Sequence, residues 1–450
     1  MTHNFHVAAK RAVLLAVLAA PVAMVSARAD EPVELPMVTV TGTAEPSLTV
    51  PTTAGARRAI ETTPGAVEIV PDDVWKKTSA QTLKEVLEYT PGVFVQPKWG
   101  EDTRLSIRGS GLSRNFHMRG IQMYQDGVPI NAADGSTDFQ ELDPTAYRYV
   151  EVYKGANGLR YGTNTLGGVL NFVSPTGYDA DAVQARADVG SFGFNRQQVS
   201  TGGVSGDFDG FLTAARLQSE GFRDHSGGYS KRASGNVGWK IDEDLETRFY
   251  VALSDIHQHI PGTVTKTSAL TSPKTAATNN LNQNYQRNIE SARLSNKTAW
   301  NLGPTTIEVG GDGVAKQLIH PIFQYLDYNY RDFGAYARAV DERQIAGHEN
   351  RLTLGVTLSG GWVDNKQFTN TGGNKGAMQS ASEDRSFNYI AYAENAFDLR
   401  PDLTLVAGLQ VMHSTRERID EFDNATNTSG ENEYTFANPK VGLLWRVDPD

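Results

Sequence analysis

From residue 183 onward the chain alternates apolar and polar positions in one segment after another. The clearest apolar sets are Val183, Ala185, Ala187 and Val189; Phe211, Thr213, Ala215 and Leu217; Ala233, Gly235, Val237, Trp239 and Ile241; and Phe249, Val251 and Leu253. A period of two is typical of a β-strand with one apolar and one polar face. The second part of the chain is therefore predicted to be a large, mostly antiparallel β-structure.

The connections between these segments differ in length. Short ones are predicted near 206–207, 242–244, 303–304, 346–347, 400–402 and 448–449, and longer polar loops at 256–286, 316–331, 360–385 and 414–433. Short turns at one end and long loops at the other are typical of a membrane β-barrel, and two strands per short turn predict about twelve strands. Aromatic residues that suit a membrane interface are Trp239, Tyr250, Trp300 and Trp445. A soluble β-sandwich or propeller is the alternative.

Residues 59–177 show a different pattern, typical of a compact α+β domain. Strands are predicted at 66–70, 104–109 and 150–153, and a turn at 126–129. Ser79 is expected to cap a helix with Leu83, Val86 and Leu87 on one face. Long polar loops at 109–120 and 130–143 separate these elements, and such loops commonly carry binding sites.

The N-terminal residues predict export. Lys10 and Arg11 precede the apolar stretch 12–25, and Ala27 and Ala29 supply a small-x-small cleavage signal, so residues 1–29 are predicted to be a signal peptide. In the following segment, 30–58, residues 37–41 alternate apolar and polar side chains. Such a strand is suited to pair with the open sheet edge of a partner. A linker with chance alternation is the alternative.

Composition narrows the choice of function. The chain has 52 acidic and 42 basic side chains among 450 residues, for a net charge of −10, which disfavours nucleic-acid binding. It has no cysteine, so disulfides and thiolate chemistry are excluded. No motif predicts a cofactor, a metal site or a catalytic Ser/His constellation, and we expect a protein that is not an enzyme.

Four segments together resemble the plug of the TonB-dependent outer-membrane receptors. They are Leu105-Ser106-Ile107-Arg108-Gly109, Gln125-Asp126-Gly127-Val128-Pro129, Val150-Glu151-Val152-Tyr153-Lys154-Gly155 and the run from Tyr161 to Asn171. The resemblance implies a plug domain at 59–177 followed, at 178–450, by the N-terminal part of an all-β transmembrane barrel. Barrels of this family have about 22 strands. Because only about twelve are predicted here, the sequence is expected to stop within the barrel.

The resemblance also implies partners and contacts. Residues 37–42 occupy the place of the TonB box, the strand that the inner-membrane protein TonB, with ExbB and ExbD, captures and pulls; the residues are Met37, Val38, Thr39, Val40, Thr41 and Gly42. Arg108, Glu151 and Lys154 are expected to contact the barrel, and Arg108 to pair with acidic residues on its inner wall. Lys154 departs from the arginine usual in the family, and an ammonium cannot form the same bidentate contact.

By this resemblance the chain is expected to import a ferric siderophore or similar iron chelate across the outer membrane, in contact with its lipid. The candidate substrate-binding residues are Arg114, Phe116, His117, Arg119, Gln122, Tyr325, Tyr328 and Tyr330. Arginines can pair with an anionic chelate, and Phe116 can stack on an aromatic group. Alternatives are another scarce metal or chelate, such as copper, nickel or cobalamin, or a passive porin. Copper would suit His117, Met118 and Met123.

Overall fold

A computed structural model describes residues 46–447, except 62, 64, 111–118, 163, 164 and 423–425. Residues from Glu45 onward form one compact unit. The predicted signal peptide, the predicted TonB box and residues 30–45 of the predicted linker lie outside the described residues. The first described helix, α1, crosses the predicted boundary between linker and plug at residue 58.

The helices are α1 (Thr53–Glu61), α2 (Leu83–Leu87), α3 (Lys266–Thr271) and α4 (Thr278–Asn282), with short 3-10 helices η2 (Asp72–Val74), η3 (Phe139–Glu141), η4 (Pro144–Ala146) and η5 (Gly155–Tyr161). The first seven strands are β1 (Val67–Pro71), β2 (Val93–Pro97), β3 (Thr103–Ile107), β4 (Ile121–Gln125), β5 (Val128–Pro129), β6 (Tyr149–Lys154) and β7 (Gly168–Val173). The remaining strands are β8 (Gln184–Val189), β9 (Asn195–Ser205), β10 (Phe208–Ser219), β11 (Gly228–Lys240), β12 (Leu245–His259), β13 (Gln286–Leu302), β14 (Thr305–Pro321), β15 (Gln324–Ile345), β16 (His348–Thr371), β17 (Asn374–Arg400), β18 (Leu403–Asp420) and β19 (Gly430–Trp445).

The plug is built on a five-stranded sheet in the order β1-β6-β7-β4-β5, with a separate β2-β3 hairpin. Strands β4 and β7 are parallel and the other pairs are antiparallel. The predicted strands at 66–70, 104–109 and 150–153 correspond to β1, β3 and β6. Apolar side chains from both sheets and from α2 form one core, which includes the fully buried Trp75, Leu87, Leu105 and Ile121. This core gives the plug a rigid scaffold for its loops.

The cap of helix α2 differs from the prediction. The N-cap is Thr82 rather than Ser79. The Thr82 hydroxyl accepts a hydrogen bond from the backbone N–H of Lys84 at 3.1 Å, and Glu85 accepts one from the backbone N–H of Thr82 at 2.9 Å. This reciprocal pair is a capping box. Several polar residues precede the helix, and tertiary packing decides which one caps it.

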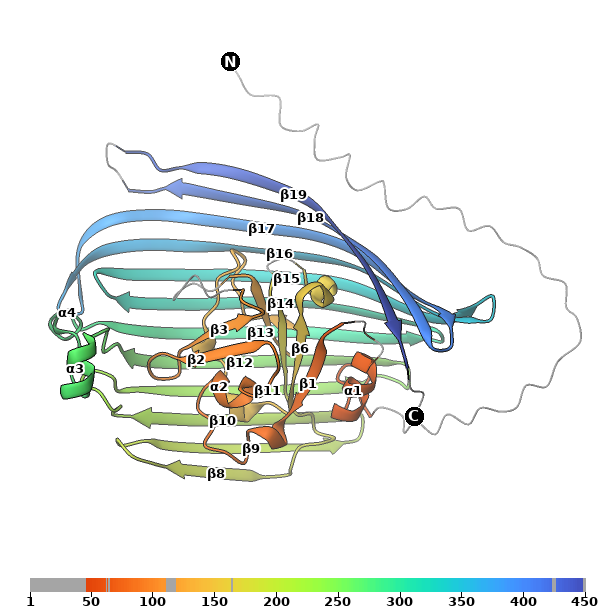
Figure 1. Cartoon of the computed structure of the whole chain (residues 1–450), viewed down its shortest axis with the longest axis horizontal. Coiled ribbons are helices and arrows are strands. Elements are labelled where there is room, and N and C mark those ends of the chain that lie inside the picture. Colours follow the sequence, from red (N-terminus) through yellow and green to blue (C-terminus); the bar gives the residue numbers. More distant parts are fainter. Residues whose placement is uncertain are drawn as a thin grey trace, which may run out of the picture. The chain divides into compact units, whose positions relative to one another are not determined.

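The second part is a twelve-stranded antiparallel sheet in which each strand from β8 to β19 pairs with the next along the chain. Figure 1 shows this order, from β8 (yellow-green) at one edge to β19 (dark blue) at the other. The predicted number of strands is confirmed. Within the described residues no helix is long and apolar enough to cross a membrane.

Two of the predicted long loops are wrong, because strands run through them. Strands β14 and β15 are separated only by residues 322 and 323, and β16 and β17 only by Gly372 and Gly373. Strands β16 and β17 are 24 and 27 residues long. The polar sequence in 316–331 and 360–385 suggested loops, yet polar strands are stable when both neighbours complete their backbone hydrogen bonds. By contrast, the predicted loop at 256–286 contains α3 and α4.

The predicted apolar face of β10 points inward. Phe211, Thr213 and Leu217 are buried on the inward face, whereas Leu212 is 52% exposed on the outward face. Tyr250, predicted as an interfacial aromatic, is inward as well and packs with Val50. Apolar side chains occur on both faces of the strand because one face packs against the plug and the other faces outward.

Candidate functional site

Acidic residues of the plug meet basic residues of the sheet in a buried cluster, which we name the ion cluster: Asp138, Glu141, Arg287, Arg293 and Lys316. Lys316 Nζ lies 2.5 Å from Asp138 Oδ2 and 2.8 Å from Glu141 Oε1. Arg293 Nη2 lies 2.7 Å from Glu141 Oε2, and Arg287 pairs with Asp138. Asp138 precedes η3 and Glu141 is its last residue, so this short helix holds the plug against β13 and β14.

The basic side chains of the ion cluster favour the ionised forms of its two carboxyl groups. Burial by itself would raise the pKa of both carboxyl groups. Arg293 and Lys316 outweigh burial and lower the pKa of Glu141 to about 2, and Arg287 and Lys316 hold the pKa of Asp138 below its ordinary range. The plug is therefore attached by ionised pairs.

Two further contacts join the plug region to the sheet. Arg232 binds Glu101 through both terminal nitrogens, at 2.9 and 2.8 Å, and donates to the carbonyl oxygen of Gln140. Glu246 accepts hydrogen bonds from Ser47 Oγ at 2.8 Å, from the backbone N–H of Leu48 at 2.7 Å and from Thr49 Oγ1 at 2.6 Å. The segment just after the predicted TonB box is thus fastened to β12, near its short-turn end.

The three residues predicted to contact the barrel lie elsewhere. Lys154 Nζ pairs within the plug with Glu68, at 3.0 Å. Glu151 accepts hydrogen bonds from Tyr161 and Asn171, also within the plug, at 3.0 and 2.9 Å. Arg108 is exposed, with a φ of 51°, and forms no ion pair within the part of the chain that the structure describes.

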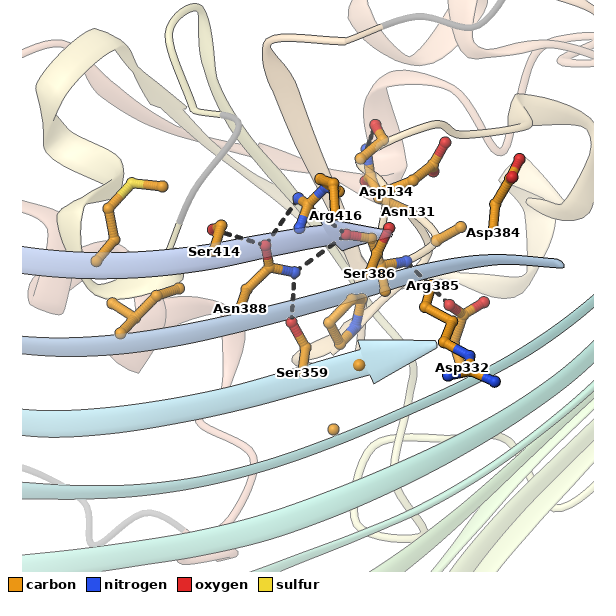
Figure 2. A pocket seen from close by; sticks show the side chains of 18 of the residues that line it. Asn131, Asp134, Asp332, Ser359, Asp384, Arg385, Ser386, Asn388, Ser414 and Arg416 are labelled. Atoms are coloured by element: carbon orange, nitrogen blue, oxygen red, sulfur yellow. Dashed lines mark hydrogen bonds between the residues drawn. The ribbon is translucent and has the colours of Figure 1, made fainter. Parts of the chain in front are cut away.

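A cavity of about 790 Å³ lies between the plug and the inward faces of β14 to β19. We name it the outer cavity. Figure 2 shows Asn388 on its wall, where it accepts hydrogen bonds from Ser414 at 2.9 Å and Arg416 at 2.8 Å and donates to Ser359 at 3.1 Å. Asn388 also donates to the carbonyl oxygen of Ala133 in the plug, at 3.0 Å. A loop of the plug therefore forms one wall of the cavity.

Charges of both signs line the outer cavity. They are Arg119, Arg385, Arg416 and Arg418, with Asp134, Asp312, Asp332, Asp384 and Glu417. Most of the arginines are paired: Arg119 with Asp134 at 3.0 Å, Arg418 with Asp384 at 3.2 Å, and Arg385 with Glu417 at 3.3 Å. Arg416 instead donates to neutral oxygens, including Asn388 Oδ1 and the Phe387 carbonyl. The wall offers many polar groups and little net charge.

The predicted substrate-binding residues fall into three groups. Arg119 and Gln122 line the outer cavity, and Arg114, Phe116 and His117 lie outside the described residues. Tyr325, Tyr328 and Tyr330 belong to strand β15 rather than a loop and do not line the cavity. Tyr328 and Tyr330 are buried in an apolar cluster with Leu318 and Leu326.

Sequence reasoning missed most of the cavity wall. Asp384 and Arg385 fall in a segment predicted as loop, and Ser414 and Arg416 in another. The signal was present, because Asp384, Ser386 and Asn388 sit two residues apart and so share one face of a strand. Continuing the period of two through the polar segments would have identified them.

A soft-metal site receives no support. Met123, proposed with His117 and Met118 as a copper ligand, has no exposed surface and lies in the plug core. Among the described residues no group of three or more His, Cys, Asp or Glu side chains is arranged to hold a metal ion.

A smaller cavity, of about 230 Å³, lies deeper between the plug and the sheet. Six residues line both cavities: Tyr124, Pro129, Tyr161, Gly334, Thr357 and Ser359. The Tyr124 hydroxyl donates to the carbonyl oxygen of Tyr161 at 2.5 Å, and their ring centroids are 5.0 Å apart. These two tyrosines form part of the wall between the two cavities.

Comparison with known proteins agrees with this architecture. The family model described as TonB-dependent Receptor Plug Domain matches residues 59–169. A ferric-pyoverdine receptor, PbuA of Pseudomonas sp. (strain M114), is 31% identical over 153 residues, which are 33% of the chain and 17% of the relative.

Solved structures show the same fold. The unliganded ferric citrate transporter FecA has a TM-score of 0.76 at 16% identity, over 87% of the chain and 62% of FecA. The siderophore receptor PiuA from Acinetobacter baumannii has a TM-score of 0.68 at 14% identity, over 90% of the chain and 64% of PiuA. The chain thus spans less than two thirds of each of these receptors. The resemblance seen in the sequence is confirmed for residues 59–169, which match the plug domain of the TonB-dependent receptors, and the sheet that follows shares the fold of FecA and PiuA.

Proposed function

We propose that this protein imports a ferric chelate across the outer membrane and binds it in the outer cavity. The observation that carries the proposal is that the plug and the sheet together border an open cavity of about 790 Å³ with many polar side chains in its wall. This volume lies within the range of small-molecule sites, which is about 300–1,000 Å³. PbuA is named a ferric-pyoverdine receptor, FecA a ferric citrate transporter and PiuA a siderophore receptor, which supports an iron chelate as substrate.

The composition of the wall bears on the kind of chelate. Because positive and negative side chains are almost balanced and mostly paired, electrostatic attraction of a strongly anionic chelate is weak here. The wall instead offers hydrogen-bond donors and acceptors on neighbouring strands, such as Ser359 and Asn388. We therefore favour a chelate with many neutral polar groups, such as amides and hydroxyls, over a compact polyanion.

A passive porin is a poorer alternative. The ion cluster, the Arg232–Glu101 pair and the Glu246 contacts fasten a folded plug to the sheet. An open water-filled pore would need none of these contacts. A plug fastened by ionised pairs suits a transporter that opens only when energy is supplied, and TonB, with ExbB and ExbD, is the proposed supplier.

Placement in the outer membrane follows from the same proposal. Outward apolar side chains such as Leu212, Phe249 and Leu294 are 52%, 58% and 66% exposed. A band of this kind suits contact with lipid. Export through the predicted signal peptide (1–29) would deliver the chain there.

Substitutions on the cavity wall test the binding site. Arg416→Gln removes charge-assisted donors, and we expect ferric-chelate affinity to fall about tenfold or more. Ser386→Trp should fill the cavity and abolish binding. The measurements are binding and iron uptake by cells that depend on this receptor, with a panel of ferric chelates of different charge. The matched control is Arg343→Gln, an exposed arginine near a short turn, which should bind normally. Normal uptake by both cavity variants would contradict the proposed site.

A further inference from the structure

One cross-strand row of the sheet crosses the outer cavity and carries opposite charges at its two ends. Asp332 on β15 pairs with Gly361 on β16, Gly361 with Ser386 on β17, and Ser386 with Arg416 on β18. Figure 2 labels Asp332, Ser386 and Arg416 on the cavity wall. Gly361 has no side chain and Ser386 a small one, so neither fills the space between the acid and the base.

A second acid stands beside the first. Asp312 on β14 also lines the cavity, two residues before Val314, which pairs with Asp332. A Cβ added to Gly334 would collide with the carboxylate of Asp312, and one added to Gly361 would collide with that of Asp332. The two glycines therefore make room for two carboxylates on neighbouring strands, at one side of the cavity.

Neither acid is paired with a base in the part of the chain that the structure describes. Asp312 forms no hydrogen bond and no ion pair there, and Asp332 accepts one hydrogen bond, from the backbone N–H of Ala133 at 2.9 Å. The other acids of the cavity wall form the ion pairs with arginines given above. The free carboxylate oxygens of the wall thus lie on β14 and β15.

The bases of the ion cluster lie close to this side of the cavity, but the plug uses them. Arg293 follows Val314 in the same cross-strand row, and it donates to Glu141 at 2.7 Å and to the carbonyl oxygen of Pro129 at 3.1 Å. Lys316 donates to Glu141 at 2.8 Å. These donors are already bound, so the two carboxylates remain able to accept hydrogen bonds from a ligand.

The opposite end of the row is positive. Arg416 forms no ion pair with any acid among the described residues, and it donates to Asn388 Oδ1 at 2.8 Å and to the carbonyl oxygen of Phe387 at 3.2 Å. At about 4.8 Å per strand, its strand lies about 14 Å along the sheet from that of Asp332. The unpaired charges of the cavity are therefore two negative groups on one side and one positive group on the other.

We propose that the chelate bound in the outer cavity carries a cationic amino group, which lies between Asp312 and Asp332, while oxygen atoms on its opposite side accept hydrogen bonds from Arg416. The inference rests on the proposed function and names the class of its substrate. A primary ammonium suits the acid side because all of its hydrogen-bonding groups are donors. Hydrogen bonds with an ionised partner are about twice as strong as neutral ones.

Four ferric chelates of different charge test the inference. They are ferrioxamine B, which ends in a primary ammonium; its N-acetyl derivative, which lacks only that charge; the uncharged ferrichrome; and the anionic ferric citrate. Binding to the detergent-extracted protein is measured by isothermal titration calorimetry. We expect ferrioxamine B to bind about tenfold more tightly than its acetyl derivative, and the other two to bind no more tightly than that derivative.

Variants locate the preference within the cavity. Asp312→Asn and Asp332→Asn should each reduce it, and the double variant should abolish it while leaving the affinity for the acetyl derivative unchanged. Asparagine keeps an oxygen for the N–H of Ala133, so the plug contact is retained. Arg416→Gln should weaken both chelates equally, because the amino group lies on the other side. The matched control is Asp255→Asn, an acid with a 41% exposed side chain on β12, which should keep the full preference.

Equal affinity for ferrioxamine B and its acetyl derivative would overturn the inference, as would tighter binding of ferric citrate or ferrichrome, or a preference that survives in the double variant. If the double variant binds neither chelate, the single variants, each of which keeps one acid, decide by the same criterion. Binding and uptake without any preference for the amino group would refute this inference and leave the proposed function intact. Absence of binding by all four chelates would contradict the proposed function itself.

Discussion

At the scale of single residues, the plug is fastened by acids on the plug and bases on the sheet. The resemblance to the family had suggested the opposite polarity, with Arg108 reaching acids on the inner wall. Instead Glu141, which is 6% exposed, lies between Arg293 and Lys316. Removing one partner of such a buried pair leaves the other charge unpaired, which costs about 3–5 kcal/mol.

Glu141→Gln should therefore lower the stability of the plug by about 3 kcal/mol at pH 7. The pKa of Glu141 is lowered from 4.5 to about 2, so its contribution is fully present above pH 4.5 and is lost as the pH falls toward about 2. Urea unfolding in detergent, followed by near-ultraviolet circular dichroism, should show the difference between wild type and variant shrinking over this range.

The control for this experiment is Glu88→Gln. Glu88 pairs with Lys84 at 3.3 Å, but both side chains are about 40% exposed. An exposed pair contributes about 0–1 kcal/mol, so this variant should unfold like the wild type. A Glu141→Gln variant as stable as the wild type at pH 7 would show that the ion cluster does not hold the plug.

At the scale of elements, helix α2 has only five residues and depends on its cap. Thr82 satisfies one backbone N–H of the first turn, and Glu85 satisfies the backbone N–H of Thr82 itself. A helix this short is not stable alone, and its apolar face is fully used in the plug core by Leu83, Val86 and Leu87.

Thr82→Ala should destabilise this helix by about 1 kcal/mol. In amide hydrogen exchange of the whole protein, residues 83–88 should then exchange roughly fivefold faster, and the twelve-stranded sheet should be unchanged. Thr78→Ala is the control, because the Thr78 hydroxyl donates to the carbonyl oxygen of Trp75 and caps no helix N–H. Equal rates in the two variants would contradict the role of the cap.

At the scale of the whole molecule, the plug, the sheet and the segment 47–49 are linked by contacts across long sequence separations. Glu246 holds Ser47, Leu48 and Thr49, which follow the predicted TonB box by only a few residues. We propose that force on residues 37–42 reaches this anchor first and the plug afterwards.

Proline at Val38 or Val40 tests the proposed role of residues 37–42, because proline removes a hydrogen-bond donor from the strand that is predicted to pair with TonB. We expect iron uptake to be lost and surface binding of the ferric chelate to remain. Val50→Pro is not a suitable control, because Val50 is buried beside the plug. Leu35→Pro, just outside the predicted box, should leave both uptake and binding intact. Loss of binding together with uptake in the Val38 and Val40 variants would contradict a role limited to energy transfer.

The alternation of side chains determined much of the architecture by itself. The period of two from residue 183 onward predicted β-strands, because backbone geometry places every second side chain on the same face, and two strands per short turn predicted about twelve of them. The turn at 126–129 was readable from its turn residues, and the strands β1, β3 and β6 from short runs of strand-forming residues. The plug motifs were recognisable because residues such as Asp126, with its φ of 55°, and Gly127 occupy backbone conformations that few side chains adopt.

Only the tertiary structure decided which face of each strand points inward and which residues meet. Both faces of β10 carry apolar side chains, since one packs on the plug and the other faces outward, so the pattern did not distinguish them. Ala133 and Asn388 meet in the outer cavity although 255 positions separate them along the chain. The charged pairs of the ion cluster likewise join residues far apart in sequence. Such contacts depend on how the plug sits against the sheet, which local periodicity does not encode.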